Sequence, residues 1–232
     1  MARVVITGSN RGIGLELVRQ HLQRRDKVYA TCRSPELATE LNNLQSTYPD
    51  ALVVLPMDVT SASAINSAAS VVNGFEAGLD LLVNNAGVGG DNASFGTIDP
   101  TDFSQVITIN TLGPLLTTQA FSHLLKGGTR PVVANISSRM GSIADNHSGG
   151  YYGYRASKAA LNMINCCMSQ DLAPHGIISV AIHPGWVKTD MGGASAPLKV
   201  NEAVEGIMNV LDGLSPVDNG NFIGWDSSQI PW

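Results

Sequence analysis

Short, almost unbroken runs of valine, isoleucine and leucine alternate along this chain with longer amphipathic segments. A strand that is apolar at nearly every position is buried on both faces, which is typical of a parallel sheet covered by helices. The runs predict strands over Arg3–Thr7, Lys27–Cys32, Leu52–Met57, Leu79–Asn84, Pro131–Ser137, Ile177–His183 and Asn221–Gly224. The amphipathic segments predict helices near residues 12–25, 35–48, 61–76, 100–126, 153–173 and 201–213.

The repeated strand–helix order predicts an α/β fold in which right-handed crossovers place helices on both faces of an open sheet. The chain has 232 residues, 44% of them hydrophobic, and no linker or internal repeat divides it. We therefore expect one Rossmann-type, doubly wound domain over residues 1–232, with a parallel sheet of about seven strands. The pattern leaves open whether the strand order is that of a dinucleotide-binding domain or of a flavodoxin-like one.

The charge balance and the cysteines exclude several kinds of partner. Fourteen Lys and Arg against 19 Asp and Glu give a net charge of −5, so we expect no nucleic-acid partner and no binding to anionic membranes. No apolar run is long enough to span a membrane. Cys32, Cys166 and Cys167 cannot form a disulfide framework, which is typical of a reduced cytoplasmic protein. We expect no metal site, because the cysteines lack a metal-binding spacing and the five histidines are dispersed.

A glycine-rich turn follows the first predicted strand and opens the first predicted helix. Its sequence is Thr7-Gly8-Ser9-Asn10-Arg11-Gly12-Ile13-Gly14. Glycine lacks a Cβ and lets the backbone approach a ligand, while a helix N-terminus offers unpaired N–H groups and a positive dipole end. This combination suits the pyrophosphate of a dinucleotide. The spacing is G-x-x-x-G-x-G rather than G-x-G-x-x-G, so the segment alone could also be an ordinary glycine-rich turn.

The residues after the second predicted strand indicate which dinucleotide is bound. An acidic residue there would bind the 2′-hydroxyl of the adenosine ribose and repel a 2′-phosphate. The strand ends at Cys32 and is followed by Arg33, with no carboxylate. Arg11 and Arg33 could converge on one phosphate, although both could instead be solvated surface residues. We therefore expect NADP(H) rather than NAD(H).

Seven short motifs, in order along nearly the whole chain, resemble those of the short-chain dehydrogenase/reductase family. They are Thr7–Gly14, Asp58-Val59, Asn84–Gly87, Asn110–Gly113, Ser137-Ser138, Tyr154–Lys158 and Pro184-Gly185. The sequences around the last three are most similar to the sniffer and C-factor-like branch of carbonyl reductases. The resemblance implies a cofactor site formed by Gly8, Ser9, Asn10, Arg11, Gly12, Ile13, Gly14, Arg33, Asp58, Val59, Asn85, Ala86, Gly87, Tyr154, Lys158, Pro184, Gly185, Val187 and Thr189.

Tyr154 and Lys158 are four residues apart and so share one face of a helix. A free tyrosine has a pKa of about 10, and a lysine cation nearby favours the phenolate and lowers that pKa. The resemblance implies that Tyr154 donates a proton to a carbonyl oxygen as hydride arrives, and that Ser138 hydrogen-bonds the same oxygen. It also implies that Lys158 holds the nicotinamide ribose and that Asn110 supports a helix kink and a water that relays protons to Lys158.

These observations lead to two hypotheses of different class. The first is an NADPH-dependent enzyme that reduces a small aldehyde or ketone to an alcohol, with the substrate pocket shaped by loops near 88–96, 142–152 and 186–200. The alternative, from the same resemblance, is a cofactor-binding signalling or sensor protein with little turnover. Helices 100–126 and 153–173 are apolar nearly all round, so they could meet in a homodimer, or loops of the same chain could cover them.

Overall fold

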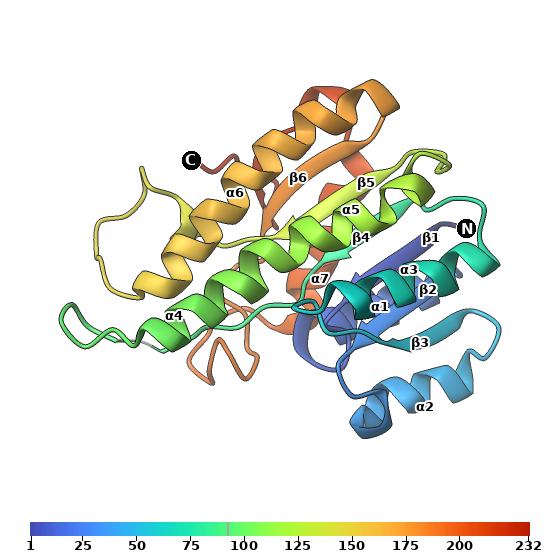
Figure 1. Cartoon of the computed structure of the whole chain (residues 1–232), viewed down its shortest axis with the longest axis horizontal. Helices are drawn as coiled ribbons and strands as arrows, with labels where there is room; N and C mark the ends of the chain where they lie inside the picture. Colours follow the sequence, from blue (N-terminus) through green and yellow to red (C-terminus); the bar gives the residue numbers. More distant parts are fainter. Residues whose placement is uncertain (92) are drawn as a thin grey trace.

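The computed structural model of this chain describes residues 1–91 and 93–232, and it confirms a parallel sheet with helices on both faces (Figure 1). The strands are β1 (Arg3–Thr7), β2 (Lys27–Cys32), β3 (Leu52–Pro56), β4 (Leu81–Asn84), β5 (Val132–Ile136), β6 (Ile178–His183) and β7 (Phe222–Gly224). The α-helices are α1 (Gly12–Gln23), α2 (Thr39–Thr47), α3 (Ala62–Phe75), α4 (Pro100–Ile107), α5 (Gly113–Leu125), α6 (Tyr152–Leu172) and α7 (Val200–Gly213). Where these elements correspond to predicted ones, most of their ends differ by no more than two residues.

The order of the strands decides between the two alternatives that the sequence left open. The seven-stranded sheet has the order β3-β2-β1-β4-β5-β6-β7, and each neighbouring pair is parallel. The order reverses between β1 and β4, as in a dinucleotide-binding domain and not as in a flavodoxin-like one. Ligands of such sheets bind in the crevice beyond the carboxyl ends of the strands at this reversal. The glycine-rich turn follows β1 and therefore lies at that point.

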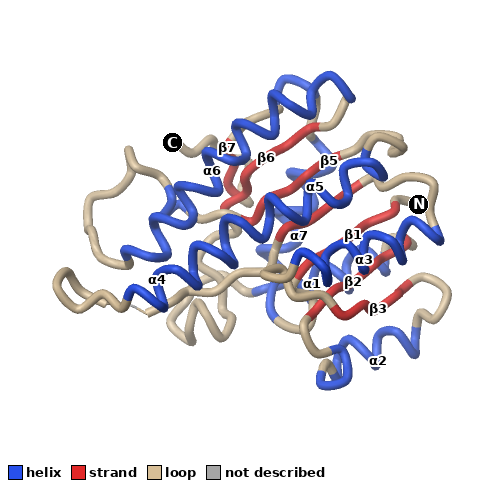
Figure 2. Tube along the Cα trace, in the orientation of Figure 1, coloured by secondary structure: helices blue, strands red, loops and turns tan. Residues whose placement is uncertain are grey.

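Alternate residues of the strands β1 to β5 face two separate hydrophobic cores. In β1, Val4 and Ile6 pack with Leu17 of α1 in a core that also includes residues of α2 and α7. Val5 points the other way and packs with Phe121 of α5 in a core shared with α3. The helix α6 lies beside α4 on the α5 side of the sheet (Figure 2). Both faces are covered, which explains why the strands are apolar at nearly every position.

The predicted helix 100–126 is in fact interrupted. A π-helical turn at Thr108–Leu112 separates α4 from α5, and the N–H of Gly113 donates to the carbonyl of Thr108 five residues earlier. Pro114 has no N–H and cannot continue the regular ladder. Such a turn re-aims the side chains within it, and it contains the buried Asn110. Hydrophobic periodicity could not reveal this break, because both helices keep their apolar positions.

The predicted helix 35–48 also divides, into a 3₁₀ turn at Pro35–Leu37 and α2. None of the helices in the described ranges is both long enough and apolar enough to cross a bilayer.

Candidate active site

The glycine-rich turn is tied directly to the segment that follows β4. The N–H groups of Asn85 and Ala86 donate to Thr7 Oγ1 at 3.0 and 2.9 Å, and Asn85 Nδ2 donates to Thr7 O at 2.9 Å. Gly8 has a φ of 66°, and a Cβ there would lie 2.8 Å from the Cα of Ala86. Only glycine permits both this backbone conformation and this close approach. The sequence after β4 thus fixes the shape of the turn after β1.

The first turn of α1 presents backbone N–H groups that no side chain caps. Arg11 is the N-cap residue, and its extended backbone (φ −161°) makes no side-chain capping bond. Gly12 and Ile13, the first residues of the helix, line the adjoining cavity. Unpaired N–H groups at the positive end of a helix form an anion site, so this part of the cavity fits a pyrophosphate.

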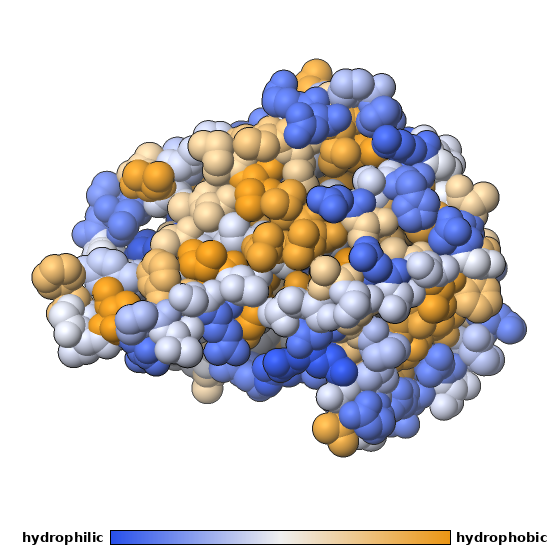
Figure 3. Space-filling model, viewed as in Figure 1, coloured by the Kyte–Doolittle hydropathy of each residue, from blue (hydrophilic) through white to orange (hydrophobic). Residues whose placement is uncertain are grey.

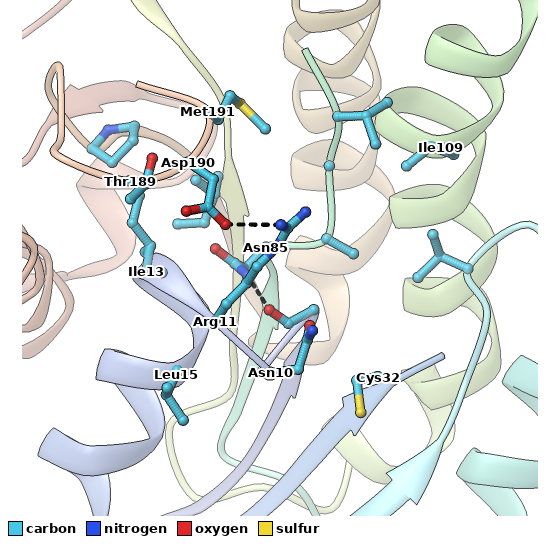
Figure 4. Close-up of a pocket in the computed structure, with 18 of the residues that line it drawn as sticks. Asn10, Arg11, Ile13, Leu15, Cys32, Asn85, Ile109, Thr189, Asp190 and Met191 are labelled. Carbon is cyan, nitrogen blue, oxygen red and sulfur yellow. Dashed lines mark hydrogen bonds and ion pairs between the residues drawn. The ribbon is translucent and has the colours of Figure 1, made fainter. Parts of the chain in front are cut away.

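A cavity of about 710 Å³ extends from the glycine-rich turn to the strand ends of β4, β5 and β6 (Figure 4). This volume is in the range of small-molecule and cofactor pockets. The predicted cofactor residues that line it are Gly8, Asn10, Arg11, Gly12, Ile13, Arg33, Asp58, Val59, Asn85, Ala86, Gly87, Tyr154, Lys158, Pro184 and Thr189. Residues that follow five strands (β1, β2, β3, β4 and β6) and residues of α1 and α6 thus meet around one space.

Four predicted cofactor residues do not line the cavity and support its wall instead. Ser9 is buried, and its hydroxyl donates to Ile6 O at 2.8 Å. A Cβ on Gly14 would lie 2.3 Å from Gly8 O. Gly185 has a φ of 87°, and a Cβ there would contact Leu198 and Trp225. Val187 is also buried.

Tyr154 and Lys158 project from α6 toward the cavity, one helical turn apart. Lys158 Nζ lies 5.8 Å from the centroid of the Tyr154 ring. Lys158 is buried, and its hydrogen bond within the described residues is to Ile136 O at 2.8 Å. The ammonium group therefore keeps further N–H donors for a ligand hydroxyl. Ser138 follows β5 and forms a hydrogen bond with Tyr154, so three of the predicted catalytic residues come together.

Burial sets the protonation of this pair. It raises the pKa of the Tyr154 hydroxyl above its ordinary value, and the hydrogen bond with Ser138 acts in the opposite direction. Burial lowers the pKa of Lys158 to about 8. The lowered tyrosine pKa expected from the sequence is therefore not found, because desolvation of the phenol outweighs the influence of its neighbours. At neutral pH the structure holds a protonated tyrosine beside a lysine cation.

Asn110 is fully buried and does not line the cavity. Its Oδ1 accepts from Val88 N at 2.9 Å, and its Nδ2 donates to Val88 O at 2.8 Å and to Ser157 Oγ at 3.0 Å. Ser157 Oγ in turn donates to Tyr154 O at 2.7 Å. The predicted kink is present as the π-helical turn, and Asn110 connects the segment after β4 to the helix that carries Tyr154.

The three predicted substrate loops contribute unequally to the cavity. From 88–96 only Val88 lines it, and Asn92 lies outside the described residues. From 186–200 it is lined by Lys188, Thr189, Asp190, Met191 and Val200. No described residue of 142–152 lines it. The described residues also include no group of three side chains placed to hold a metal ion.

Comparison with known proteins identifies this architecture. The profile of the family described as short chain dehydrogenase matches residues 2–198. The chain belongs to the short-chain dehydrogenase family. It is therefore an oxidoreductase, and the resemblance seen in its motifs is confirmed.

Two solved structures of this family superpose closely on the whole chain. NADPH-bound carbonyl reductase from chicken fatty liver is 41% identical, with a TM-score of 0.95 over 100% of this chain and 99% of that one. Carbonyl reductase Sniffer of D. melanogaster is 35% identical, with a TM-score of 0.97 over 100% of both chains. A shorter relative, C-signal of Myxococcus xanthus, is 47% identical over 154 residues, which are 66% of this chain and 93% of that protein. The predicted sniffer and C-factor-like branch is confirmed by these neighbours.

One feature of this dehydrogenase site was missed from the sequence. Arg11 Nη1 forms an ion pair with Asp190 Oδ2 at 2.8 Å, and Figure 4 shows the two side chains pointing toward one another. Both side chains are largely exposed. No sequence signal predicts the pair, because its members are 179 residues apart and meet only when β1 and β6 lie in one sheet.

Proposed function

We propose that this protein is an NADPH-dependent carbonyl reductase that converts an aldehyde or ketone to an alcohol, with Tyr154 as the proton donor. The observation that carries the proposal is the meeting of Tyr154, Ser138 and Lys158 beside the cavity that begins at the glycine-rich turn. A dinucleotide site and a proton donor within one cavity are what hydride transfer to a carbonyl requires.

The lining of the cavity supports NADP(H) as the cofactor. The uncapped N-terminus of α1 suits the pyrophosphate, and the buried Lys158 suits a ribose hydroxyl. Arg11 and Arg33 line the same cavity, and guanidinium groups suit the 2′-phosphate. The chicken and Burkholderia multivorans relatives were crystallised with NADPH and NADP respectively. When bound, the cofactor supplies a hydride.

The residues of this chain would donate the proton and stabilise the charge that develops on the carbonyl oxygen. Tyr154 donates its phenolic proton to the carbonyl oxygen as that oxygen gains negative charge, and the product is the neutral alcohol. Ser138 donates a hydrogen bond to the same oxygen. The Lys158 ammonium, charged below a pKa of about 8, stabilises the phenolate that Tyr154 leaves behind. The raised pKa of Tyr154 keeps the proton available at neutral pH.

The test is oxidation of NADPH in the presence of a panel of aldehydes, ketones, quinones and dicarbonyls, with NADH in parallel. We expect turnover with NADPH and weaker turnover with NADH, together with formation of the alcohol. Tight NADPH binding without turnover across the panel would remove the support for carbonyl reduction. Absence of NADPH binding would contradict the cofactor assignment itself.

Arg33→Ala tests the choice between the two cofactors. Arg33 is exposed and lines the cavity. Hydrogen bonds from Thr60 lower the pKa of Asp58, and the positive charge of the nearby Arg33 lowers it further. Hydrogen bonds to charged groups are worth about 1.5–3 kcal/mol, so we expect kcat/KM for NADPH to fall about ten- to hundredfold and that for NADH to stay unchanged. Arg24→Ala, at the opposite end of α1, is the control. An equal loss with both cofactors would show that Arg33 does not recognise the phosphate.

The signalling alternative receives support only from the relationship to C-signal. A protein that merely binds the cofactor does not need Tyr154, Ser138 and Lys158 assembled together, so the arrangement favours turnover. NADPH binding that is unchanged in Tyr154→Phe, with no carbonyl reduced by either protein, would favour the alternative.

We also propose that α5 and α6 form the interface of a homodimer. Figure 3 shows hydrophobic side chains gathered along these helices, and Leu112 and Met163 are 43% and 65% exposed. Residues 112–122 and 159–168 contain no charged side chain. Burial of such a face on a second copy is favourable. Sedimentation should show a dimer that Met163→Glu converts to a monomer with unchanged circular dichroism. A wild-type protein that remains monomeric at high concentration would contradict this.

A further inference from the structure

The chain between Ser138 and Tyr154 contains a strained reversal that the proposed chemistry does not explain. Gly149, Gly150 and Tyr151 have φ values of 64°, 69° and 51°. Glycine adopts such values freely, but a bulky residue such as tyrosine rarely does. A conformation of this kind persists only where surrounding contacts hold it in place. The residues that contact this reversal therefore indicate which part of the structure depends on its conformation.

Arg155 supplies contacts that hold the reversal. Its Nε donates to Gly149 O at 3.2 Å, its Nη2 to Ser148 Oγ at 2.9 Å and its Nη1 to Met140 O at 3.3 Å. A guanidinium group is planar and directs its donors rigidly. The single side chain therefore fixes the end of the loop relative to its beginning. Sequence position gives no hint of this role, because Arg155 is simply the residue after Tyr154.

The bond to Met140 connects Arg155 to Ser138. Met140 belongs to the 3₁₀ turn Arg139–Gly141, and its N–H donates to Ser138 Oγ at 3.2 Å. This N–H binds a lone pair of the serine hydroxyl and so fixes the position of Ser138 Oγ. A shift of the turn would therefore move the Ser138 hydroxyl.

The same turn is packed tightly against the catalytic helix. A Cβ on Gly141 would lie 2.7 Å from the main-chain carbon of Lys158. Asn162, one turn further along α6, donates from Nδ2 to Gly141 O at 3.3 Å. These contacts fix the side of the turn that faces α6. Arg155, in addition, connects the turn to the loop 142–150.

We propose that Arg155 is a positioning residue for the reduction. Its side chain holds the loop 142–150 against the Arg139–Gly141 turn and so sets the position of the Ser138 hydroxyl relative to Tyr154. The inference rests on the proposed carbonyl reductase function. Arg155 does not line the cavity, so it acts through Met140 and Ser138 and not on the substrate or cofactor. Its loss should therefore lower the rate of the chemical step without weakening cofactor binding.

The first test compares Arg155→Met with Arg155→Lys and Arg130→Met. Displacement of a reacting group by about 1 Å can cost about a hundredfold, so we expect kcat to fall ten- to hundredfold in Arg155→Met, with the Kd for NADPH within twofold of wild type. Arg155→Lys keeps the positive charge but lacks the planar guanidinium group with its several N–H donors, so it should restore only part of the rate. Arg130 Nη2 donates to Leu214 O at 2.8 Å, beyond the opposite ends of the strands, and its variant should keep the wild-type kcat.

The second test measures amide hydrogen exchange, which does not depend on turnover. Within the loop, Asp145 N donates to Ser142 Oγ and Gly149 N donates to Asn146 Oδ1. We expect these amides and that of Met140 to exchange faster in Arg155→Met than in Arg130→Met, with α6 unchanged.

The two tests separate this inference from the function on which it rests. Faster exchange with an unchanged kcat would overturn the positioning role. Unchanged exchange would show that Arg155 does not hold the loop 142–150 against the Arg139–Gly141 turn. If the wild-type protein reduces no carbonyl, the proposed function fails, and exchange alone then decides whether Arg155 holds the loop.

Discussion

Replacement of Tyr154 by phenylalanine is expected to remove carbonyl reduction while NADPH still binds. The variant loses one hydroxyl, the proposed proton donor, and keeps the ring beside Lys158. General acid catalysis by a positioned side chain is worth about 10²–10⁴ in rate, so kcat should fall at least a hundredfold. The Kd for NADPH, measured by calorimetry, should change less than threefold, because the glycine-rich turn and Arg33 are untouched.

Tyr152→Phe is the matched control for this loss. Tyr152 also lies at the start of α6, but its side chain is 39% exposed and it packs near Phe95 outside the main cavity. Its variant should keep the wild-type kcat. A Tyr154→Phe protein that retains more than a tenth of the wild-type kcat would show that another group donates the proton.

Replacement of Gly14 by alanine is expected to damage both folding and cofactor binding. The new Cβ would lie 2.3 Å from Gly8 O and 2.5 Å from Asn85 Nδ2. Alanine is intrinsically the better helix former, but overpacking of this kind costs about 1–3 kcal/mol. The backbone can yield only by moving the glycine-rich turn or the segment after β4. We therefore expect a lower midpoint in urea and at least a tenfold weaker Kd for NADPH.

Gly74→Ala in α3 separates the steric effect from helix propensity. A Cβ at Gly74 meets nothing within 4 Å, so this variant should be stabilised by up to about 1 kcal/mol. Its NADPH affinity should equal that of wild type. If Gly14→Ala behaved in the same way, the packing of the turn against the segment after β4 would not be what shapes the cofactor site.

Much of this fold could be predicted because each strand is a short continuous apolar segment that is buried on both faces. The bounds of β1 and β2 agree with the sequence prediction residue for residue. The order of the strands was not decided, because apolar patterns show which faces are buried and not which strands are neighbours. The apolar pattern did not reveal the π-helical turn for a similar reason, since the hydrogen bond from Gly113 to Thr108 leaves that pattern intact. Only the family resemblance implied a kink at Asn110.

The candidate site was predicted where its residues form motifs and was missed where they meet only in space. Tyr154 and Lys158 lie on one helix face, so four-residue spacing was sufficient to pair them. The pair Arg11–Asp190 joins two loops at distant ends of the chain, and only the assembled sheet brings it together. The pKa of Tyr154 was predicted in the wrong direction, because a sequence shows a neighbouring charge but not the depth of burial.

Transfer of deuterium from labelled NADPH shows directly whether hydride passes from the cofactor to the carbonyl carbon. The wild-type protein is supplied with a carbonyl from the active part of the panel and with NADPH deuterated at C4 on either face, in two parallel reactions. We expect the alcohol formed with one of the two labelled cofactors to carry one deuterium on its carbinol carbon, detected by mass spectrometry. Alcohol without deuterium from either cofactor would contradict direct hydride transfer in the cavity beside Tyr154.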